Sequence, residues 1–325
     1  MPGGQDSTRV GVEVTDPPVA GAGLHHLALF YESMGDYLTA LQQLVDAAAE
    51  RDEPVLMTVP AARLSWLRGE LSFEPGRVAF ADMTELGRNP ARIIPSLRAF
   101  ADRHPQQRVW SVGEPAWAGR SAAELCEVTR YEALTNAAFA GAPATRLCPY
   151  DVTALPEPVL ANAARTHPSI ARHCREAVSA SYLQPPRLPP GCDIPIPPPP
   201  ATAERLAYEH DLRPVRAMIA RSASRAGLAA ERVTDLVIAA SEVAANTLRH
   251  TRAGGTAHVW HTGREIICQL HDTGVIEDPL ACSRLPAGDL PGGKGLWLVN
   301  QVCDLVELRS ASPAGSTIRL HMNLG

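Results

Sequence analysis

The stretch Asp235-Leu-Val-Ile-Ala-Ala-Ser-Glu242-Val-Ala-Ala-Asn246-Thr-Leu-Arg-His250 has the pattern of a single helix that ends in a polar turn. Glu242 and Asn246 stand four residues apart, so a helix places both side chains on one face, about one turn from each other. A carboxylate can accept a proton from a hydroxyl group, and an amide oxygen is a ligand suited to Mg²⁺, which often arrives with phosphates. The pair therefore predicts a site that handles a nucleotide, provided that the rest of the chain completes it.

Apolar residues recur at helical spacing along the same stretch and predict that one side of this helix is buried. They are Val233, Leu236, Val237, Ala240, Val243, Ala244 and Leu248. The spacing of acid and amide is not specific by itself, because Glu132 and Asn136 repeat it in another helical segment. A solvated helix edge is the ordinary interpretation of such a pair, so the motifs that follow in the sequence have to decide.

Three further motifs follow this helix. Asp272-Thr-Gly274 ends a predicted strand, where the aspartate can accept a hydrogen bond from a purine amine and the glycine lets the backbone approach the ring. Gly292-Gly-Lys-Gly-Leu296 opens a helix, where backbone N–H groups and the helix dipole favour phosphate oxygens and Lys294 adds a positive charge. Gly315-Ser-Thr317 enters the last strand as a turn of small residues that can close the floor of a pocket.

In this order the motifs resemble the N, G1, G2 and terminal boxes of the GHKL ATP-binding fold, over roughly residues 201–325. The run Gly-Leu-Trp-Leu-Val-Asn-Gln-Val-Cys-Asp-Leu-Val-Glu, residues 295–307, is especially similar to the actinobacterial anti-sigma-factor serine kinases of that superfamily. A histidine kinase is the less favoured relative, because no helix with a phospho-acceptor histidine is predicted ahead of this segment. The resemblance implies ATP and Mg²⁺ as the bound cofactors.

The resemblance also implies a role for each matched position. Glu242 would act as the general base on a serine of a protein substrate, and Asn246 would hold Mg²⁺. Asp272 would bind the adenine amino group, and Thr317 would form a hydrogen bond near the adenine. The remaining positions expected around the nucleotide are Gly274, Gly293, Lys294 and Gly295.

Kinases of this type bind a sigma factor and phosphorylate a serine of an anti-anti-sigma protein of the STAS type. The resemblance implies both partners, and it leaves a homodimer open as the state of assembly. Ile276 stands where the G1 motif of the family has its second glycine. The alternative interpretation is therefore a non-catalytic adaptor that keeps the fold and binds its partner without turning over ATP.

The N-terminal half alternates apolar runs with helical patterns. The predicted strands cover 24–31, 54–59, 78–82, 108–112 and 145–150, and the predicted helices cover 37–51, 64–71, 90–103, 121–140 and 157–166. This alternation predicts an α/β layered domain with a largely parallel sheet. The half contains no G-x-x-x-x-G-K-[ST] motif, so the sequence gives no support for a P-loop ATPase.

Several segments of this half resemble the MEDS sensory domain, which is distantly related to RecA-like ATPase cores. They are residues 24–31, 113–120, 131–139, 147–151 and 166–168. The resemblance covers roughly residues 22–178 and implies that this domain senses a small molecule. His25, His26, Cys148 and His167 lie in these segments as candidate metal ligands, but their spacing fits no metal motif, and ordinary hydrogen-bonding residues at strand ends are the favoured interpretation.

The segment Gln184 to Pro200 is rich in proline and predicts an extended spacer between two domains. We therefore expect a flexible lead-in at 1–21, an α/β RecA-like MEDS domain at 22–178, a Pro-rich linker at 179–202, and a GHKL-type α+β sandwich at 203–325. In the sandwich, helices at 213–226, 235–250 and 293–304 would cover one face of a mixed sheet. The strands of that sheet are predicted at 256–261, 265–272, 305–310 and 316–322.

Composition limits the remaining classes of function. A net charge of −5 without a basic tail gives no electrostatic support for binding nucleic acid. No run approaches the ~20 apolar residues that span a bilayer, and the N-terminus lacks the pattern of a secretion signal. Seven scattered cysteines without a C-x-x-C pair are typical of reduced thiols. We expect a cytoplasmic protein that contacts neither a membrane nor nucleic acid directly.

Overall fold

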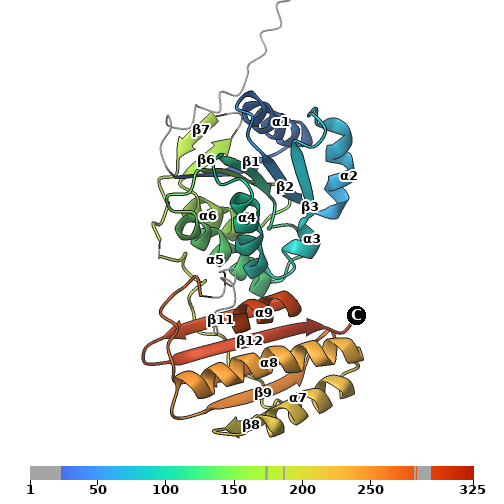
Figure 1. Cartoon of the computed structure of the whole chain (residues 1–325), viewed down its shortest axis with the longest axis vertical. Helices are drawn as coiled ribbons and strands as arrows, with labels where there is room; N and C mark the ends of the chain where they lie inside the picture. The colour runs from blue at the N-terminus through green and yellow to red at the C-terminus, as the bar shows by residue number, and fades with distance from the viewer. Residues whose placement is uncertain (1–22, 173–174, 186, 282, 284–293) are drawn as a thin grey trace, which may run out of the picture. The chain divides into compact units, whose positions relative to one another are not determined.

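The computed structural model describes residues 23–172, 175–185, 187–281, 283 and 294–325, so the lead-in predicted at 1–21 lies outside the described residues. The chain divides into two compact units, each assembled from segments that are distant in the sequence (Figure 1). The first unit comprises Met1–Met83, His104–Ala118 and Phe139–Tyr182, and the second comprises Thr84–Arg103, Gly119–Ala138 and Leu183–Gly325. No helix in the described part of the chain combines the length and the apolar character needed to cross a bilayer.

A seven-stranded sheet forms the first unit, in the order β3-β2-β4-β5-β1-β6-β7. Its strands are β1 (Leu24–Tyr31), β2 (Val55–Val59), β3 (Val78–Asp82), β4 (Val109–Gly113), β5 (Ala144–Asp151), β6 (Ser169–Arg172) and β7 (Arg175–Val178). Neighbouring strands run parallel except for the antiparallel pair β6 and β7. The predicted α/β domain with a largely parallel sheet is confirmed, and β6 and β7 are additions that the sequence pattern does not predict.

The helices of this unit are α1 (Met34–Glu50), α2 (Ala61–Glu70) and α6 (Glu157–Thr166). Ser33 caps α1, because its hydroxyl accepts the main-chain N–H of Asp36 at 3.1 Å. Buried side chains of α1 and α2 form one cluster with alternate residues of the central strands, among them Leu27 and Leu29 of β1. Since side chains alternate along a strand, His26 of β1 points to the opposite face of the sheet.

The second unit contains a five-stranded sheet in the order β11-β12-β10-β9-β8. Its strands are β8 (Glu204–Tyr208), β9 (Gly255–His261), β10 (Glu265–Asp272), β11 (Leu305–Ala311) and β12 (Gly315–Asn323). Every neighbouring pair is antiparallel, so the prediction of a mixed sheet is wrong. Tight turns join β9 to β10 and β11 to β12, and such turns can connect only antiparallel neighbours. The pairs β10–β12 and β8–β9 are not joined by tight turns, so their antiparallel direction could not be predicted from the turns.

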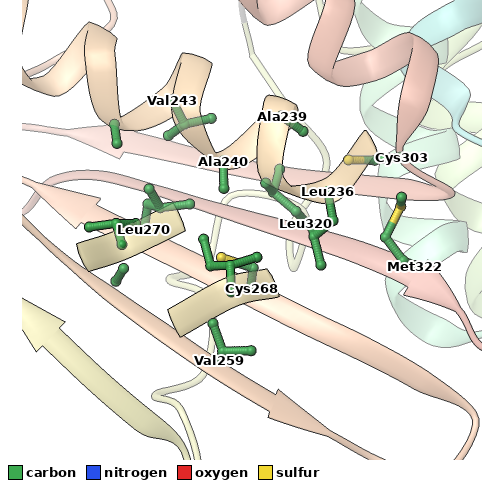
Figure 2. Packing of buried hydrophobic residues seen from close by; sticks show 14 of the residues in the cluster. Leu236, Ala239, Ala240, Val243, Val259, Cys268, Leu270, Cys303, Leu320 and Met322 are labelled. Atoms are coloured by element: carbon green, nitrogen blue, oxygen red, sulfur yellow. The ribbon is translucent and has the colours of Figure 1, made fainter. Parts of the chain in front are cut away.

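Three helices pack on one face of this sheet: α7 (Arg213–Arg225), α8 (Ala230–His250) and α9 (Lys294–Val302). Figure 2 shows side chains of α8, including Leu236 and Val243, directed at Cys268, Leu270 and Leu320 of the sheet. The helix runs without a break for 21 residues. Its predicted apolar stripe is confirmed, since every member is buried in the core or packs against it.

The segments Thr84–Arg103 and Gly119–Ala138 add further helices to the second unit. These are the 3-10 helix η1 (Pro90–Arg92), α4 (Ile93–Asp102) and α5 (Ala122–Ala138), with the short α3 (Met83–Leu86) just before them. Between β7 and β8 the described residues form neither helix nor strand, in line with the prolines of this segment.

His321 of β12 lies between two carboxylates in the sheet of the second unit. Its Nδ1 is 2.9 Å from Oε2 of Glu265 and its Nε2 is 2.9 Å from Oε1 of Glu307, so a ring that donates to both must be protonated. Burial by itself lowers the pKa of His321, but the two carboxylates outweigh burial and the net pKa lies above its usual value of 6.5. The histidine therefore acts as a buried cation that joins β10, β11 and β12.

We expect His321→Gln to destabilise the protein more at pH 6 than at pH 9. A raised folded-state pKa gives stability that is fully present below the unfolded value and is lost as the pH rises through the folded value. The loss in the free energy of unfolding should be about 2–3 kcal/mol at pH 6 and smaller at pH 9. Urea unfolding followed by circular dichroism measures both, with the exposed His261→Gln as the control. An equal loss at the two pH values would refute the ion-pair assignment.

Candidate nucleotide-binding site

The predicted acid and the predicted glycine motif meet where α8 and α9 approach each other. A Cβ built on Gly295 would lie 2.6 Å from Oε2 of Glu242, which is closer than real non-bonded contacts. A larger residue in the first turn of α9 would therefore displace the end of the Glu242 side chain from its present position. The structure thus brings Glu242 and Gly295 together, although they are far apart in the sequence.

Asp272, the last residue of β10, is held by two hydrogen bonds. The hydroxyl of Thr247 donates to Oδ2 at 2.6 Å, and the main-chain N–H of Gly274 donates to Oδ1 at 2.8 Å. Thr247 directly follows Asn246 on α8, so the first bond ties the aspartate turn to the helix that carries the acid and the amide. Each carboxylate oxygen keeps a second lone pair, and the group can still accept a hydrogen bond from an exocyclic amine.

The turn after Asp272 contains Gly274, which leaves space beside the aspartate, and Ile276, which packs against the core. A Cβ on Gly274 would lie 2.9 Å from Cγ2 of Thr251 and 3.0 Å from Oδ1 of Asp272. The glycine therefore leaves a cradle that any other residue would fill. Ile276, at the second glycine position of the motif, packs partly buried against the apolar core, and its N–H donates to Oγ of Ser310 at 2.8 Å.

Thr317 is not brought to the aspartate. In the register of β10 and β12, Asp272 is paired with Ser316, and His271 is paired with Thr317. Directly paired residues share a face of the sheet and successive residues alternate, so Thr317 lies on the other face, where its hydroxyl is 3.0 Å from Nδ1 of His271. Ser316 is the residue of this motif that meets the turn, because its hydroxyl donates to the carbonyl of Gly274 at 2.7 Å.

Of the other predicted positions, Asn246 lies on α8 and Lys294 on α9. Asn246 is half-buried on α8, and its Oδ1 accepts a hydrogen bond from Nη1 of the exposed Arg249 at 2.8 Å. The amide oxygen has a second lone pair that can serve a cation. Lys294 is exposed as the first residue of α9. Gly293 lies outside the described residues.

Thr247 is a site residue that sequence reasoning missed. It is only 2% exposed, and it accepts a hydrogen bond from the hydroxyl of Tyr208 at 3.1 Å while it donates to Asp272. Burial raises the pKa of Tyr208 to about 12, which keeps that hydroxyl a donor at neutral pH. The available signal is a threonine in the row of buried apolar residues that contains Val243.

We expect Thr247→Val to weaken ATP binding about tenfold and to destabilise the protein by about 1–3 kcal/mol, because one buried donor is lost and the Tyr208 hydroxyl is left without its acceptor. Valine has nearly the same shape, so packing is preserved. Thermal unfolding and ATP titration measure the two effects. Thr234→Val, at an exposed threonine of the same helix, is the matched control. Unchanged ATP affinity in Thr247→Val would show that this bond does not position Asp272 for a nucleotide.

The first unit has a polar cluster of its own at the carboxyl ends of its parallel strands. Nη1 of Arg63 is 2.6 Å from Oε1 of Glu114, and the hydroxyl of Tyr37 donates to Oε2 at 3.3 Å. Burial raises the pKa of Glu114 to about 7 despite the nearby guanidinium. Open α/β sheets bind ligands at this edge. The cluster is therefore the place in this unit where a small molecule is expected.

Comparisons with known proteins agree with the two halves of the chain. Residues 25–168 match the family model described as MEDS, the MEthanogen/methylotroph, DcmR Sensory domain, and residues 206–322 match that of the histidine kinase-like ATPase domain. The comparison with curated proteins gave no match. Among solved structures, one described as an ATPase domain is similar with 14% identity and a TM-score of 0.31, over 45% of this chain and 68% of that one, a likeness too low to carry an argument. With the motifs and the geometry above, the two family matches identify the protein as a MEDS sensory domain followed by a histidine kinase-like ATPase domain.

Proposed function

We propose that the protein is a cytoplasmic signalling regulator that binds Mg-ATP, sequesters a sigma factor and phosphorylates a serine of a STAS-type anti-anti-sigma protein under control of its MEDS domain. The observation that carries the proposal is the convergence of Glu242, Asp272 and Gly295 around α8. A side chain at Gly295 would displace the Glu242 carboxylate, and Thr247 binds Asp272 to the same helix. A phosphoryl-transfer site needs an acid, a carboxylate that accepts a hydrogen bond from the adenine amine, and a glycine at the start of a helix.

The residues present fit a nucleotide with its metal ion. A side chain at Gly274 or Gly295 would crowd Asp272 or Glu242, and the Asn246 amide offers a hard oxygen. When bound there, Mg²⁺ supplies charge neutralisation for the phosphates. Glu242 takes the proton of the substrate serine as its oxygen forms the new bond to the γ-phosphorus, while the bond to the leaving ADP oxygen breaks. Asp272 holds the exocyclic amine and so fixes the position of the base.

Control by the sensory domain is supported by contacts within the second unit. Nδ2 of Asn89 donates to the carbonyl and to Oδ1 of Asn300 in α9, both at 3.1 Å. Nη1 of Arg309 on β11 lies 2.7 Å from Oε1 of Glu127 on α5, and both side chains are nearly buried. Asn89 and Glu127 fall within the residues matched by the MEDS model. Because α9 begins beside Glu242, a movement of the segments that carry Asn89 and Glu127 can change the geometry of the nucleotide site.

The test is a transfer reaction with the full chain. The protein is incubated with γ-labelled ATP, Mg²⁺ and each STAS-domain protein of the same genome, and the labelled residue is found by mass spectrometry. We expect one of these proteins to be labelled on a serine, and we expect EDTA to abolish the labelling. A sigma factor should co-purify with the chain before ATP and the STAS-domain protein are added. A chain that retains a sigma factor but neither binds ATP nor labels a partner would instead favour the non-catalytic adaptor.

A further inference from the structure

Three side chains that can bind a metal ion gather in the first unit. His26 lies on β1, Cys148 lies on β5 opposite Ala28, and His167 directly follows α6. They are buried, with 1%, 0% and 0% of their surfaces exposed. Each offers one ligand atom, and these atoms lie within 4.8 Å of one another. The rings of the two histidines are 4.0 Å apart between centroids.

The spacing of these atoms fits a tetrahedral metal site. Zinc binds a thiolate sulfur at about 2.3 Å and an imidazole nitrogen at about 2.0–2.1 Å, which places two such ligands about 3.5 Å apart at a tetrahedral angle. The observed distance between Sγ of Cys148 and Nε2 of His26 is 3.4 Å. A metal ion can therefore enter without a large movement of the two strands that carry these residues. The same distance also suits a hydrogen bond between thiol and imidazole, so a second observation has to decide.

That observation is the orientation of the His167 ring. Its Nδ1 lies 2.8 Å from the main-chain carbonyl of Ala163 in α6, and a carbonyl can only accept, so Nδ1 carries the proton. In the neutral ring the lone pair is then on Nε2. Histidines that bind metal ions almost always donate their other ring N–H to a carbonyl or carboxylate in this way, which fixes the tautomer and the ring orientation. The same ring is thus prepared as a ligand before any ion arrives.

We propose that His26, Cys148 and His167 are ligands of a transition metal ion, for which Zn²⁺ is the best fit. A thiolate combined with imidazoles favours zinc over the hard cations Mg²⁺ and Ca²⁺, which take oxygen ligands. Binding releases the proton of the Cys148 thiol and forms the sulfur–metal bond. The ion joins β1, β5 and the end of α6, so it stabilises the sensory domain from the sheet face opposite α1.

The experiment uses the full chain, depleted of metal under denaturing conditions and refolded with Co²⁺ as a spectroscopic replacement for Zn²⁺. We expect one equivalent of Co²⁺ per chain, with visible bands of a tetrahedral ion and a near-ultraviolet charge-transfer band from a thiolate ligand. Cys148→Ser should remove the charge-transfer band and lower the zinc content of the purified protein about tenfold or more, since one ligand is lost. Cys268→Ser, at an equally buried cysteine of the other sheet, should change neither.

A second measurement needs no variant and therefore does not depend on whether Cys148→Ser folds. The X-ray absorption spectrum of the zinc-loaded wild-type protein should show one sulfur at about 2.3 Å and at least two imidazole nitrogens at about 2.0–2.1 Å. A shell of oxygen alone, or one with two or more sulfurs, would place the ion elsewhere and overturn the proposal. So would a refolded wild-type chain that takes up no more metal than Cys148→Ser.

Discussion

Asp272→Asn should weaken the binding of ATP by about 100-fold, because the substitution replaces a carboxylate oxygen with an NH2 group where only acceptors fit. Both oxygens of Asp272 already accept hydrogen bonds, from Thr247 and from the N–H of Gly274. The new amide must turn its own donors toward one of these groups or toward the adenine amine. Isothermal titration of the variant with ATP in Mg²⁺ measures the loss.

Asp278→Asn is the matched control for this variant. Oδ1 of Asp278 also accepts the main-chain N–H two residues further on, from Leu280 at 2.9 Å, in the same loop. It therefore repeats the local turn geometry of Asp272, and its substitution should leave ATP affinity within about threefold of wild type, near the lower end of what a single neutral hydrogen bond contributes. If the two variants lose affinity equally, Asp272 has no special role and the adenine lies elsewhere.

Glu242→Gln should slow phosphoryl transfer about 10²- to 10⁴-fold while ATP affinity stays nearly unchanged, because a positioned general base contributes to the rate by this amount. Glutamine has the size of glutamate, so it keeps the close approach to Gly295, but its amide cannot take a proton from a serine. Single-turnover transfer to the STAS-type partner measures the rate, and ATP titration measures the affinity. The split between the two readouts separates a base from a residue that only shapes the pocket.

Glu231→Gln, an exposed acid in the first turn of α8, controls for the loss of one negative charge on that helix. Its transfer rate should equal that of wild type. Transfer that persists in Glu242→Gln at the wild-type rate would show that another group accepts the serine proton. A loss of ATP binding in the same variant would instead assign Glu242 to the nucleotide pocket.

The features that could be predicted from the sequence are those with a long or regular pattern. The 21-residue helix α8 has an apolar stripe whose period identifies both the helix and its buried side. The parallel sheet is indicated by short apolar runs that alternate with helices, since strands buried on both faces contain few polar residues. The meeting of Glu242 with Gly295 is also predictable, from the order of the motifs and their resemblance to one fold.

The features that could not be predicted are short or depend on distant residues. The strands β6, β7 and β8 have four or five residues each, and charged side chains interrupt their apolar pattern. The face of β12 that meets the turn is set by its register with β10, and a shift of one residue exchanges Ser316 for Thr317.

Contacts between distant segments could not be predicted from the sequence pattern either. The hydrogen bond from Asn89 to Asn300 joins residues 211 positions apart. In the same way His26 meets Cys148 only because β1 pairs with β5 in one particular register. Spacing along the chain therefore argues against a metal site that the arrangement of the strands favours. The periodicity of apolar residues indicates which side of a helix or strand is buried, but it does not indicate which other element packs against that side.

The direct test of the nucleotide site is isothermal titration of the folded wild-type chain with ATP, in the presence and in the absence of Mg²⁺. Because Glu242 lies beside the first turn of α9 and Asp272 is bonded to Thr247 of the same helix α8, we expect saturable binding with one ATP per chain, tightened by Mg²⁺. A folded protein that shows no saturable binding at millimolar ATP, with or without the metal ion, would contradict it.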